Sequence, residues 1–482
     1  MTPFRQPDRR THQPIMMLAR LLLLCLLLPG LLLAEQNLPE MGDPASALLS
    51  PNQEQQLGRS LVREVRRTLP LEHDPQINGY VQSLGQRLIS STPDAHAHFN
   101  FLVVDDPRIN AFAMPGGIIG INTGLISAAR NEAELAAVIA HEIAHVTQRH
   151  LARMYAGSSR IDLATGLAIL AGIIAAAYDP QVGQAAIIGG LAAGTQARIN
   201  HTRANEQEAD RIGISILSGA NYDPRAMPQF FERMMQLSRS NPDSVPEFLR
   251  THPVTANRLS DSQSRAEQER EGGYRDDSDE FRFIQARVNA RQDPGQAIAR
   301  HTRGSDSDEP VSRYAYATAL LTRGDTSGAA SALQGLDHEQ VPRIMLNLSR
   351  AEIAQRSNRN QEAVDLLAQL NDLYPRHLPV IHQYADALLA TGRPLEAMTL
   401  IDDYLNQGHE EPELLRLKAR SADSAGQRAI SQETMAEYYF YLGQYGESLH
   451  QLELALQASD LTSFIEARVE SKREIVRGWI RQ

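Results

Sequence analysis

Apolar residues recur every three to four positions along most of the chain, a spacing that is typical of amphipathic helices. In the first half of the sequence this pattern predicts helices over residues 52–69, 76–90, 131–154, 205–217 and 227–237. Three shorter apolar runs predict strands over residues 99–104, 111–114 and 118–122, the last two separated by the turn sequence Pro-Gly-Gly. We therefore expect an α+β domain that is mostly helical and contains a small β-sheet.

The helix predicted over residues 131–154 contains the sequence His141-Glu142-Ile143-Ala144-His145. Two histidines four residues apart lie on one face of a helix, so both imidazoles can reach one metal ion. Zinc commonly takes three protein ligands and one water, from which a carboxylate such as Glu142 can remove a proton. The alternative is a surface helix, but the neighbouring residues are mostly Ala, Val and Ile. Because a buried helix does not carry such polar groups without a partner, the motif predicts a zinc site.

A third ligand must come from elsewhere in the chain. His150 follows His145 by five residues, which on a continuous helix turns it about 140° away from the site. Glu206 is a better candidate, and Asp210, one turn later on the same helical face, could accept the outer N–H of a ligating histidine. The alternative for this segment is a solvated acidic face, and Glu208 is expected to lie at the surface.

These motifs resemble those of the zinc metallopeptidase family that includes HtpX and the CAAX prenyl endopeptidases. The resemblance covers roughly residues 50–270 and rests on the histidine motif, on Asn-Glu-Gln-Glu-Ala-Asp-Arg over residues 205–211, and on two further runs, residues 109–117 and 251–253. It implies a gluzincin-type domain, which we assign to residues 35–270. It is closest to a secreted branch of the family that carries a C-terminal tetratricopeptide array.

The resemblance also implies roles for His252 and Arg258. His252 would be either a removable fourth ligand that blocks the water or a group that steadies the oxyanion. Arg258 would stabilise the charge that develops on a peptide carbonyl. From the residues alone, His252 is an ordinary histidine in a loop predicted over residues 241–253.

The N-terminus has the features of a secretory signal peptide. A basic start is followed by an apolar run from Leu21 to Leu33 and by Ala34, which predicts a signal over residues 1–34. The run of about 14 residues is shorter than the roughly 20 needed to cross a bilayer, which argues against an uncleaved membrane anchor. Cys25 is the only cysteine, so a cleaved chain would contain none, and this suits an oxidising periplasm.

Two further segments raise functional alternatives. Residues 161–196 are rich in Ala, Gly, Ile and Leu, but each half is too short to span a bilayer. We expect a packed helical hairpin, with a lid or a surface for peripheral contact with membrane or client as the alternative. The strand over residues 118–122 is a candidate edge for pairing with an extended peptide, and ordinary sheet core is the alternative.

The C-terminal part of the chain contains an internal repeat. Four positions recur at intervals of 34 residues in three copies: Ala317, Ala351 and Ala385; Gly324, Asn358 and Gly392; Ala329, Ala363 and Ala397; and Leu333, Leu367 and Ile401. A further copy begins 51 residues after the third, at Ala436, which suggests that a single extra helix is inserted. This spacing predicts an all-α tetratricopeptide solenoid over residues 280–482, a module that binds proteins or peptides.

Together these features predict a zinc metalloendopeptidase with one Zn²⁺ per chain, fused to an interaction module. The net charge of −11 argues against nucleic-acid binding. The family resemblance implies a periplasmic enzyme that acts on misfolded or stalled outer-membrane proteins, assists their assembly, and contacts the barrel-assembly machinery through the repeats. The alternative is a non-proteolytic chaperone or scaffold with a latent zinc site.

Overall fold

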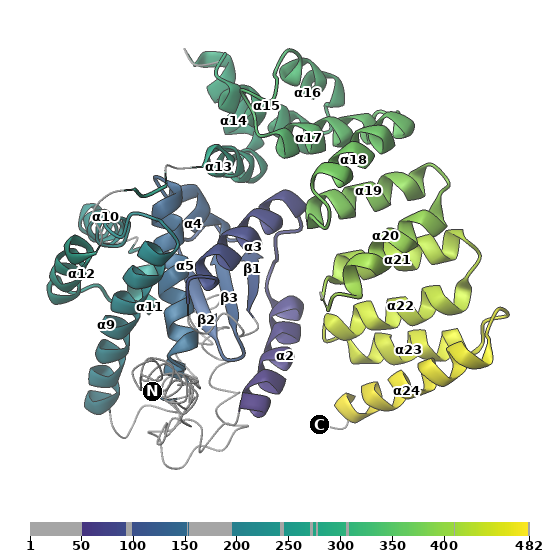
Figure 1. Cartoon of the computed structure of the whole chain (residues 1–482), viewed down its shortest axis with the longest axis horizontal. Coiled ribbons are helices and arrows are strands. Elements are labelled where there is room, and N and C mark those ends of the chain that lie inside the picture. Colours follow the sequence, from purple (N-terminus) through teal and green to yellow (C-terminus); the bar gives the residue numbers. More distant parts are fainter. Residues whose placement is uncertain are drawn as a thin grey trace, which may run out of the picture.

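The computed structural model describes residues 51–92, 99–151, 153, 195–241, 245–269, 273–275, 278–304, 308–408 and 410–480. A small sheet and a group of helices form the first part, and a curved array of helices forms the second (Figure 1). The first part contains α2 (Pro51–Thr68), α3 (Pro75–Ile89), α4 (Thr123–Ala128), α5 (Glu132–Thr147), α9 (Thr195–Gly219), α10 (Ala226–Ser240), α11 (Glu247–Thr251) and α12 (Ala256–Gln268). The predicted α+β class is confirmed.

The sheet has three strands, β1 (Asn100–Val104), β2 (Ala111–Met114) and β3 (Ile118–Asn122), in the order β1-β3-β2. β3 pairs in parallel with β1 and antiparallel with β2, and all five of its residues are buried. The three strands lie where the sequence predicts them. The candidate peptide-binding edge was wrong, however, because β3 is the central strand and both of its sides are already paired.

α2, α3 and α10 agree with the predicted ranges to within three residues, whereas α9 is longer than predicted because it begins at Thr195 rather than at residue 205. The chain also departs from the prediction at two further places. α5 ends at Thr147 rather than at residue 154, because Gln148 and Arg149 form a turn in which Arg149 has a φ of +50°. The predicted loop over residues 241–253 contains the short helix α11, and His252 is its C-terminal cap. These two differences both affect the site described below.

The second part consists of antiparallel helices joined by short turns. They are α13 (Asp279–Gln292), α14 (Pro294–Arg303), α15 (Pro310–Thr322), α16 (Thr326–Leu333), α17 (Arg343–Arg356), α18 (Asn360–Leu373), α19 (Leu378–Ala390), α20 (Pro394–Leu405), α21 (Pro412–Ser424), α22 (Arg428–Tyr441), α23 (Tyr445–Leu456) and α24 (Ser463–Ile480). The predicted tetratricopeptide-type solenoid is therefore confirmed.

The prediction that a single extra helix is inserted was wrong. Ala419 in α21 lies 34 residues after Ala385, and the turn glycine Gly426 lies 34 residues after Gly392 with the same positive φ. Counted from α15, which contains Ala317, α21 and α22 therefore form the regular fourth pair, and α23 and α24 follow as the fifth. Ala436 belongs to α22, the second helix of its pair, which explains the apparent offset.

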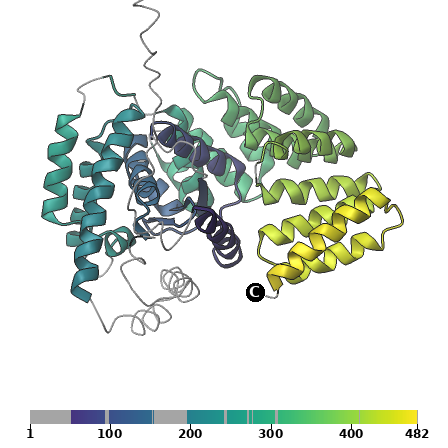
Figure 2. The same ribbon diagram turned by 60° about the horizontal axis from the view of Figure 1, so that its bottom comes forward.

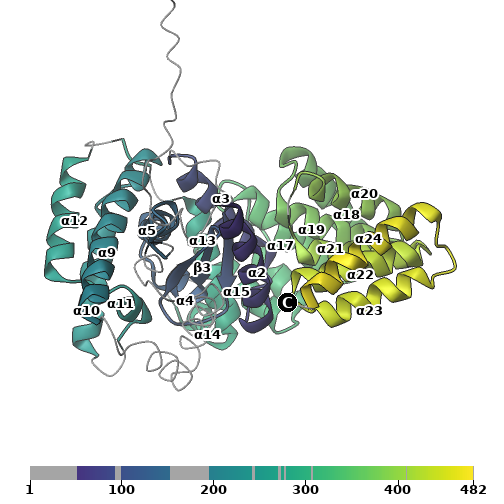
Figure 3. The ribbon, with the colours of Figure 1, turned by 90° about the horizontal axis from the view of Figure 1, so that it is seen from below.

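The two parts share one hydrophobic core. Buried residues of α13 and α15 belong to the same cluster as those of α3, α5 and the sheet. At this junction the Arg287 guanidinium of α13 donates three hydrogen bonds to Asp74, the N-terminal cap of α3, over 2.6–3.0 Å. The array then curves so that α22 to α24 lie near α2, as Figures 1 and 3 show. There Arg63 of α2 donates to the Tyr445 hydroxyl and lies over the Trp479 ring.

Several predicted features lie outside the described residues. These are the signal segment 1–34 and the apolar segment 161–196, apart from the first two residues of α9. None of the described helices is both long and apolar enough to cross a membrane. Figure 2 shows the first part and the helical array side by side from a second direction.

Candidate metal centre

Helix α5 carries the histidine motif through the middle of the first part. The Asn131 side chain caps its N-terminus by accepting a hydrogen bond from the Glu134 N–H. Every residue from Leu135 to Ala144 is buried, so His141 and Glu142 are enclosed by apolar neighbours. As expected from the sequence, these polar groups are buried together rather than spread over a surface helix.

Helix α9 brings the carboxylates. Glu206, Asp210 and Gly213 are spaced by four and three residues, so they share one helical face. A Cβ atom at Gly213 would lie only 3.2 Å from the backbone nitrogen of His141. The absence of a side chain at Gly213 therefore lets α9 pack closely on α5, and this close packing brings Glu206 and Asp210 to His141.

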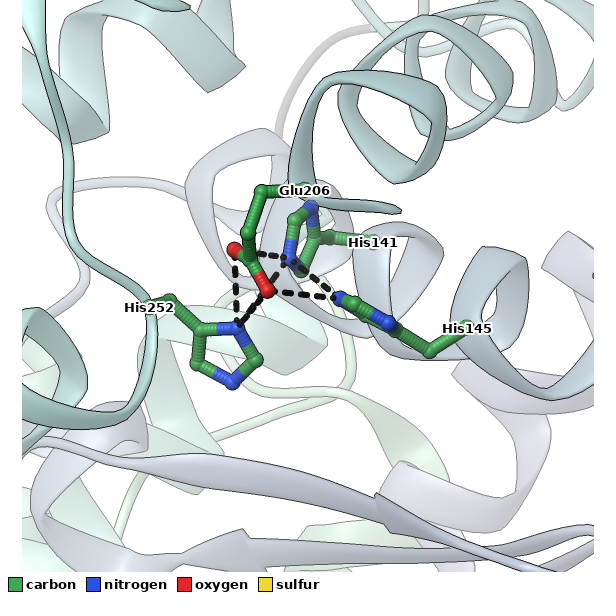
Figure 4. A group of neighbouring side chains, drawn as sticks. All are labelled: His141, His145, Glu206 and His252. Carbon is green, nitrogen blue, oxygen red and sulfur yellow. Dashed lines mark hydrogen bonds and ion pairs between the residues drawn. The ribbon is translucent and has the colours of Figure 1, made fainter. Parts of the chain in front are cut away.

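Four side chains from three segments converge with their donor atoms facing one another (Figure 4). The Nε2 atoms of His141 and His145 are 3.0 Å apart, and the Glu206 carboxylate oxygens lie 3.5 Å and 3.4 Å from them. Ligands bound to zinc at about 2.0–2.1 Å in a tetrahedron are roughly 3.3–3.4 Å apart. The spacing and the chemistry of these donors therefore fit a tetrahedral metal ion.

Asp210 lies behind His141, on the side away from this cluster. Its Oδ1 is 3.0 Å from His141 Nδ1, a distance at which the carboxylate attracts the Nδ1 proton and leaves the Nε2 lone pair free. Arg258 donates from Nε and Nη2 to Asp210, both over 2.7 Å, and from Nη1 to the Pro253 carbonyl. Its Nη1 also lies 2.9 Å from Glu206.

The position of Arg258 differs from the expectation that it stabilises a carbonyl oxyanion. It is only 2 % exposed, and all of its nitrogens are engaged with Asp210, Glu206 and Pro253. An arginine that is buried and already neutralises Asp210 and Glu206 is not turned towards a substrate carbonyl. The geometry instead gives it the task of holding these carboxylates in place.

His252 reaches the cluster from the end of α11. Its Nδ1 lies 3.1 Å from Glu206 and 3.4 Å from His141 Nε2, so it is a possible fourth ligand. Its Nε2 lies 3.3 Å from a Glu142 carboxylate oxygen, which is fully buried and forms no hydrogen bond among the described residues. The Phe248 ring anchors α11 by stacking on His252 and packing against Phe231.

The electrostatic balance of the cluster favours a positive charge at its centre. Burial opposes protonation of His141, but hydrogen bonding to Asp210 and Glu206 outweighs it and raises the pKa of His141 to about 9. Burial likewise opposes ionisation of Glu206, yet His252 and the other two histidines hold the pKa of Glu206 well below its usual range. A bound cation would supply the positive charge that Asp210 and Glu206 otherwise favour through protonation of the histidines.

Comparison with known proteins places this chain in a family. The model for peptidase family M48 matches residues 75–266, and a tetratricopeptide repeat model matches residues 354–421. The chain is 32 % identical over 448 residues to the beta-barrel assembly-enhancing protease of Escherichia coli (strain K12), which covers 92 % of this chain and 91 % of that protein. The chain belongs to peptidase family M48.

Other members show how far the similarity extends. The beta-barrel assembly-enhancing protease of Yersinia pestis is 32 % identical over 461 residues, 93 % of each chain. The mitochondrial metalloendopeptidase OMA1 of Arabidopsis thaliana is 34 % identical over 152 residues, which is 32 % of this chain and 28 % of that protein. The M48 membership and the His–Glu cluster identify this chain as a metalloendopeptidase that uses a divalent metal.

Sequence reasoning missed one histidine of this M48 peptidase. His150 was expected on a flank or at the end of the helix, and it lies just beyond that end, with its Nδ1 2.8 Å from His145 Nδ1. Its Nε2 lies 3.1 Å from Glu208, which also accepts a hydrogen bond from Arg153 over 2.7 Å. Glu208 is therefore a paired, partly exposed residue rather than a plain surface one. Helical periodicity alone did not reveal that the helix ends at residue 147, and this end is what allows His150 to contact His145.

Proposed function

We propose that this chain is a periplasmic, zinc-dependent endopeptidase that cleaves misfolded or stalled outer-membrane proteins and assists their assembly through its repeats. The observation that carries the proposal is the convergence of His141, His145 and Glu206 within one buried cluster beside Glu142. The names of two relatives that cover nine-tenths of the chain support the link to outer-membrane assembly.

The residues divide the chemical work as follows. His141, His145 and Glu206 would hold one Zn²⁺ per chain, which when bound acidifies a water and polarises a peptide carbonyl. Glu142 takes the proton of the attacking water and returns it to the leaving amine. Asp210 keeps His141 in the tautomer whose Nε2 faces the ion, and Arg258 holds Asp210 and Glu206 in place.

His252 fits the role of a removable fourth ligand better than that of an oxyanion-stabilising group. Its Nδ1 faces the same point as the other three donors, so it takes the fourth position around that point, where the water of a working site would bind. Its Nε2 faces Glu142, so in this position His252 also lies against the general base. A latent resting state follows, because a substrate must displace this side chain before water can enter.

The substrate chain would pair with β2. β2 forms the edge of the sheet beside α5, and β3 is its only strand partner among the described residues. Asn110 accepts a bond from Asn122 of β3, so the alternation along the strand directs the N–H and C=O groups of Ala111 and Ala113 to the open side. The Phe248 N–H donates to the Ile109 carbonyl, which ties the His252 segment to the start of this edge.

The repeat domain offers a place for a client and for assembly partners. A cavity of about 800 Å³ lies between the two parts of the molecule, bounded by α2, α3 and β1 on one side and by α19 to α22 on the other. Its walls carry both acidic and basic residues, among them Arg66, Glu72 and Glu411. Such a mixed lining suits an extended polypeptide held largely through its backbone, and the partner of the repeats would be the barrel-assembly machinery.

The test compares zinc content and cleavage of an unfolded outer-membrane protein for the chain lacking residues 1–34 and for its Glu142→Gln variant. Zinc in both proteins and cleavage by the parent alone would support the proposal. Absence of zinc from the parent would overturn it. Cleavage that survives in Glu142→Gln would remove Glu142 from the mechanism.

The competing function is a non-proteolytic chaperone whose zinc site stays closed, and the position of His252 is the observation that favours it. His252→Ala separates the two, with His338→Ala in the exposed part of the array as the matched control. Under our proposal, His252→Ala keeps its zinc and cleaves faster than the parent. A chaperone would show no cleavage in either His252→Ala or His338→Ala, while assembly of its clients would survive Glu142→Gln.

The apolar segment 161–196 stays a prediction, as a packed helical hairpin or, alternatively, as a lid or a peripheral contact with membrane or client. Fractionation tests the periplasmic localisation. Release of the protein with the periplasmic fraction would agree with the proposal, whereas retention on carbonate-washed membranes would contradict it.

A further inference from the structure

The two histidines of α5 are supported in different ways. His141 Nδ1 faces a carboxylate directly, at 3.0 Å from Asp210. His145 also directs Nε2 to the cluster, but its Nδ1 faces the ring of His150 at 2.8 Å. No carboxylate among the described residues lies within ion-pairing distance of His145 Nδ1. The outer nitrogen of His145 therefore depends on a neutral ring rather than on an acid.

The backbone is shaped to place this ring. α5 ends at Thr147, and Arg149 adopts a φ of +50°, a conformation that residues other than glycine rarely take. Arg149 is held there by Glu54 of α2, to which its Nε donates over 2.9 Å. The turn brings His150 back over His145, where only 3 % of the His150 surface is exposed. A backbone held in an uncommon conformation beside an active site often serves the site.

If His145 binds a metal through Nε2, the protons of His145 and His150 can be assigned in only one way. Its Nδ1 must then carry the proton and donate to His150 Nδ1, which accepts. His150 therefore carries its own proton on Nε2 and donates it to Glu208 at 3.1 Å. Each donor meets an acceptor, and the chain of hydrogen bonds ends on a carboxylate that Arg153 also holds.

We propose that His150 and Glu208 are positioning residues that orient the metal ligand His145, as Asp210 orients His141. This inference rests on the proposed zinc site, because the relay has no purpose without an ion at His145 Nε2. Outer partners of metal-bound histidines fix the ring and its tautomer, and their loss typically weakens metal binding 10- to 100-fold. Glu206 and Glu208 thus give one helix, α9, both a ligand and the end of the relay.

The substitutions follow from the proton assignment. His150→Ala removes the acceptor for His145 and is expected to weaken zinc binding by about 10- to 100-fold. His150→Asn keeps an acceptor oxygen near the position of Nδ1 and should restore much of the affinity. Glu208→Ala should weaken binding less than His150→Ala, because His150 can still accept from His145. Glu208 is partly exposed, so this variant does not disturb the core.

The experiment measures zinc affinity by competition with a chromophoric chelator at one fixed pH. All variants are made in the Glu142→Gln background of the chain lacking residues 1–34, so that self-cleavage cannot interfere. The absorption spectrum of the Co²⁺-substituted protein gives a second readout, because reorientation of His145 changes the ligand field. Circular dichroism confirms the fold, and His338→Ala serves as the histidine control.

The outcomes separate this inference from the proposed function. The order parent, Asn, Ala in decreasing affinity, with an altered Co²⁺ spectrum for His150→Ala, would support the relay. Unchanged affinity and spectrum in both His150→Ala and Glu208→Ala would overturn it while leaving the zinc site intact. If His150→Ala does not fold, Glu208→Ala and His150→Asn decide by the same measurements. Failure of the parent itself to bind zinc would overturn both.

Discussion

The ion pair between Arg287 and Asp74 provides a quantitative test of how the two parts of the molecule are joined. Arg287 comes from the first helix of the array, and Asp74 caps the helix that borders the sheet. Both side chains are at most 5 % exposed, and three nitrogen–oxygen contacts of 2.6–3.0 Å link them. Arg287→Met keeps most of the side-chain volume but leaves the Asp74 carboxylate buried without its main partner.

The expected loss follows from this geometry. Removing one partner of a fully buried pair typically costs about 3–5 kcal/mol of the free energy of unfolding, because the remaining charge is not compensated. This loss is accompanied by a rise in the pKa of Asp74, because burial without Arg287 favours the neutral carboxyl. The double variant Asp74→Asn/Arg287→Met should recover part of it, since it buries no charge and asparagine still caps the helix.

The pKa of Asp74 determines how the difference in stability between parent and variant changes with pH. Burial opposes ionisation of Asp74 in the parent, but Arg287 and Arg291 hold the pKa of Asp74 below its usual value. The pair therefore stabilises the parent above about pH 4, and this stability is lost as the pH falls through the lowered pKa. In Arg287→Met the pKa of Asp74 rises, so acid neutralises the unpaired charge. The difference in stability between parent and variant should be largest at neutral pH and should shrink towards pH 4.

Urea unfolding followed by far-UV circular dichroism, repeated at several pH values, measures this difference. Arg291→Met is the control, because that side chain is 32 % exposed and should contribute at most about 1 kcal/mol. A loss below 1 kcal/mol in Arg287→Met, or a loss of the same size at every pH, would refute the argument that a buried charge is left unpaired.

Three further outcomes can be checked separately. Gly213→Val should push α9 away from α5 at His141 and lower zinc affinity by at least 10-fold in chelator competition, whereas a variant that binds zinc normally would contradict the close packing. Arg63→Met should change the emission of Trp479, the only tryptophan, because its guanidinium lies 4.2 Å from the indole ring, and unchanged emission would mean that α2 and α24 do not meet in solution. Burial raises the pKa of Glu411 from 4.5 to about 7, so this carboxyl lowers the free energy of unfolding as the pH rises from about 4.5 to about 7. Glu411→Gln should flatten this part of the stability–pH curve, and an unchanged slope would place the effect elsewhere.

The sequence by itself determined the elements and most of the site. The spacing of His141 and His145 on one helical face, and of Glu206 and Asp210 on another, is a local property that follows from helical geometry. The 34-residue period likewise predicted the solenoid, because each repeat needs the same small residues and turns. Such features depend on neighbours in the chain, so they can be recognised without knowing the fold.

Tertiary structure decided which of these groups meet and how they are used. The sequence could not show that β3 is the central strand, because strand order depends on pairing between distant segments. Arg258 was expected to face the substrate, but packing of α12 against α9 placed it behind Asp210 and Glu206. Helical periodicity predicted that His150 points away from the site. The turn at Arg149, which Glu54 of a distant helix holds in place, instead directs His150 towards it. Long-range contacts outweighed local preference at each of these positions, and two of them lie at the metal site.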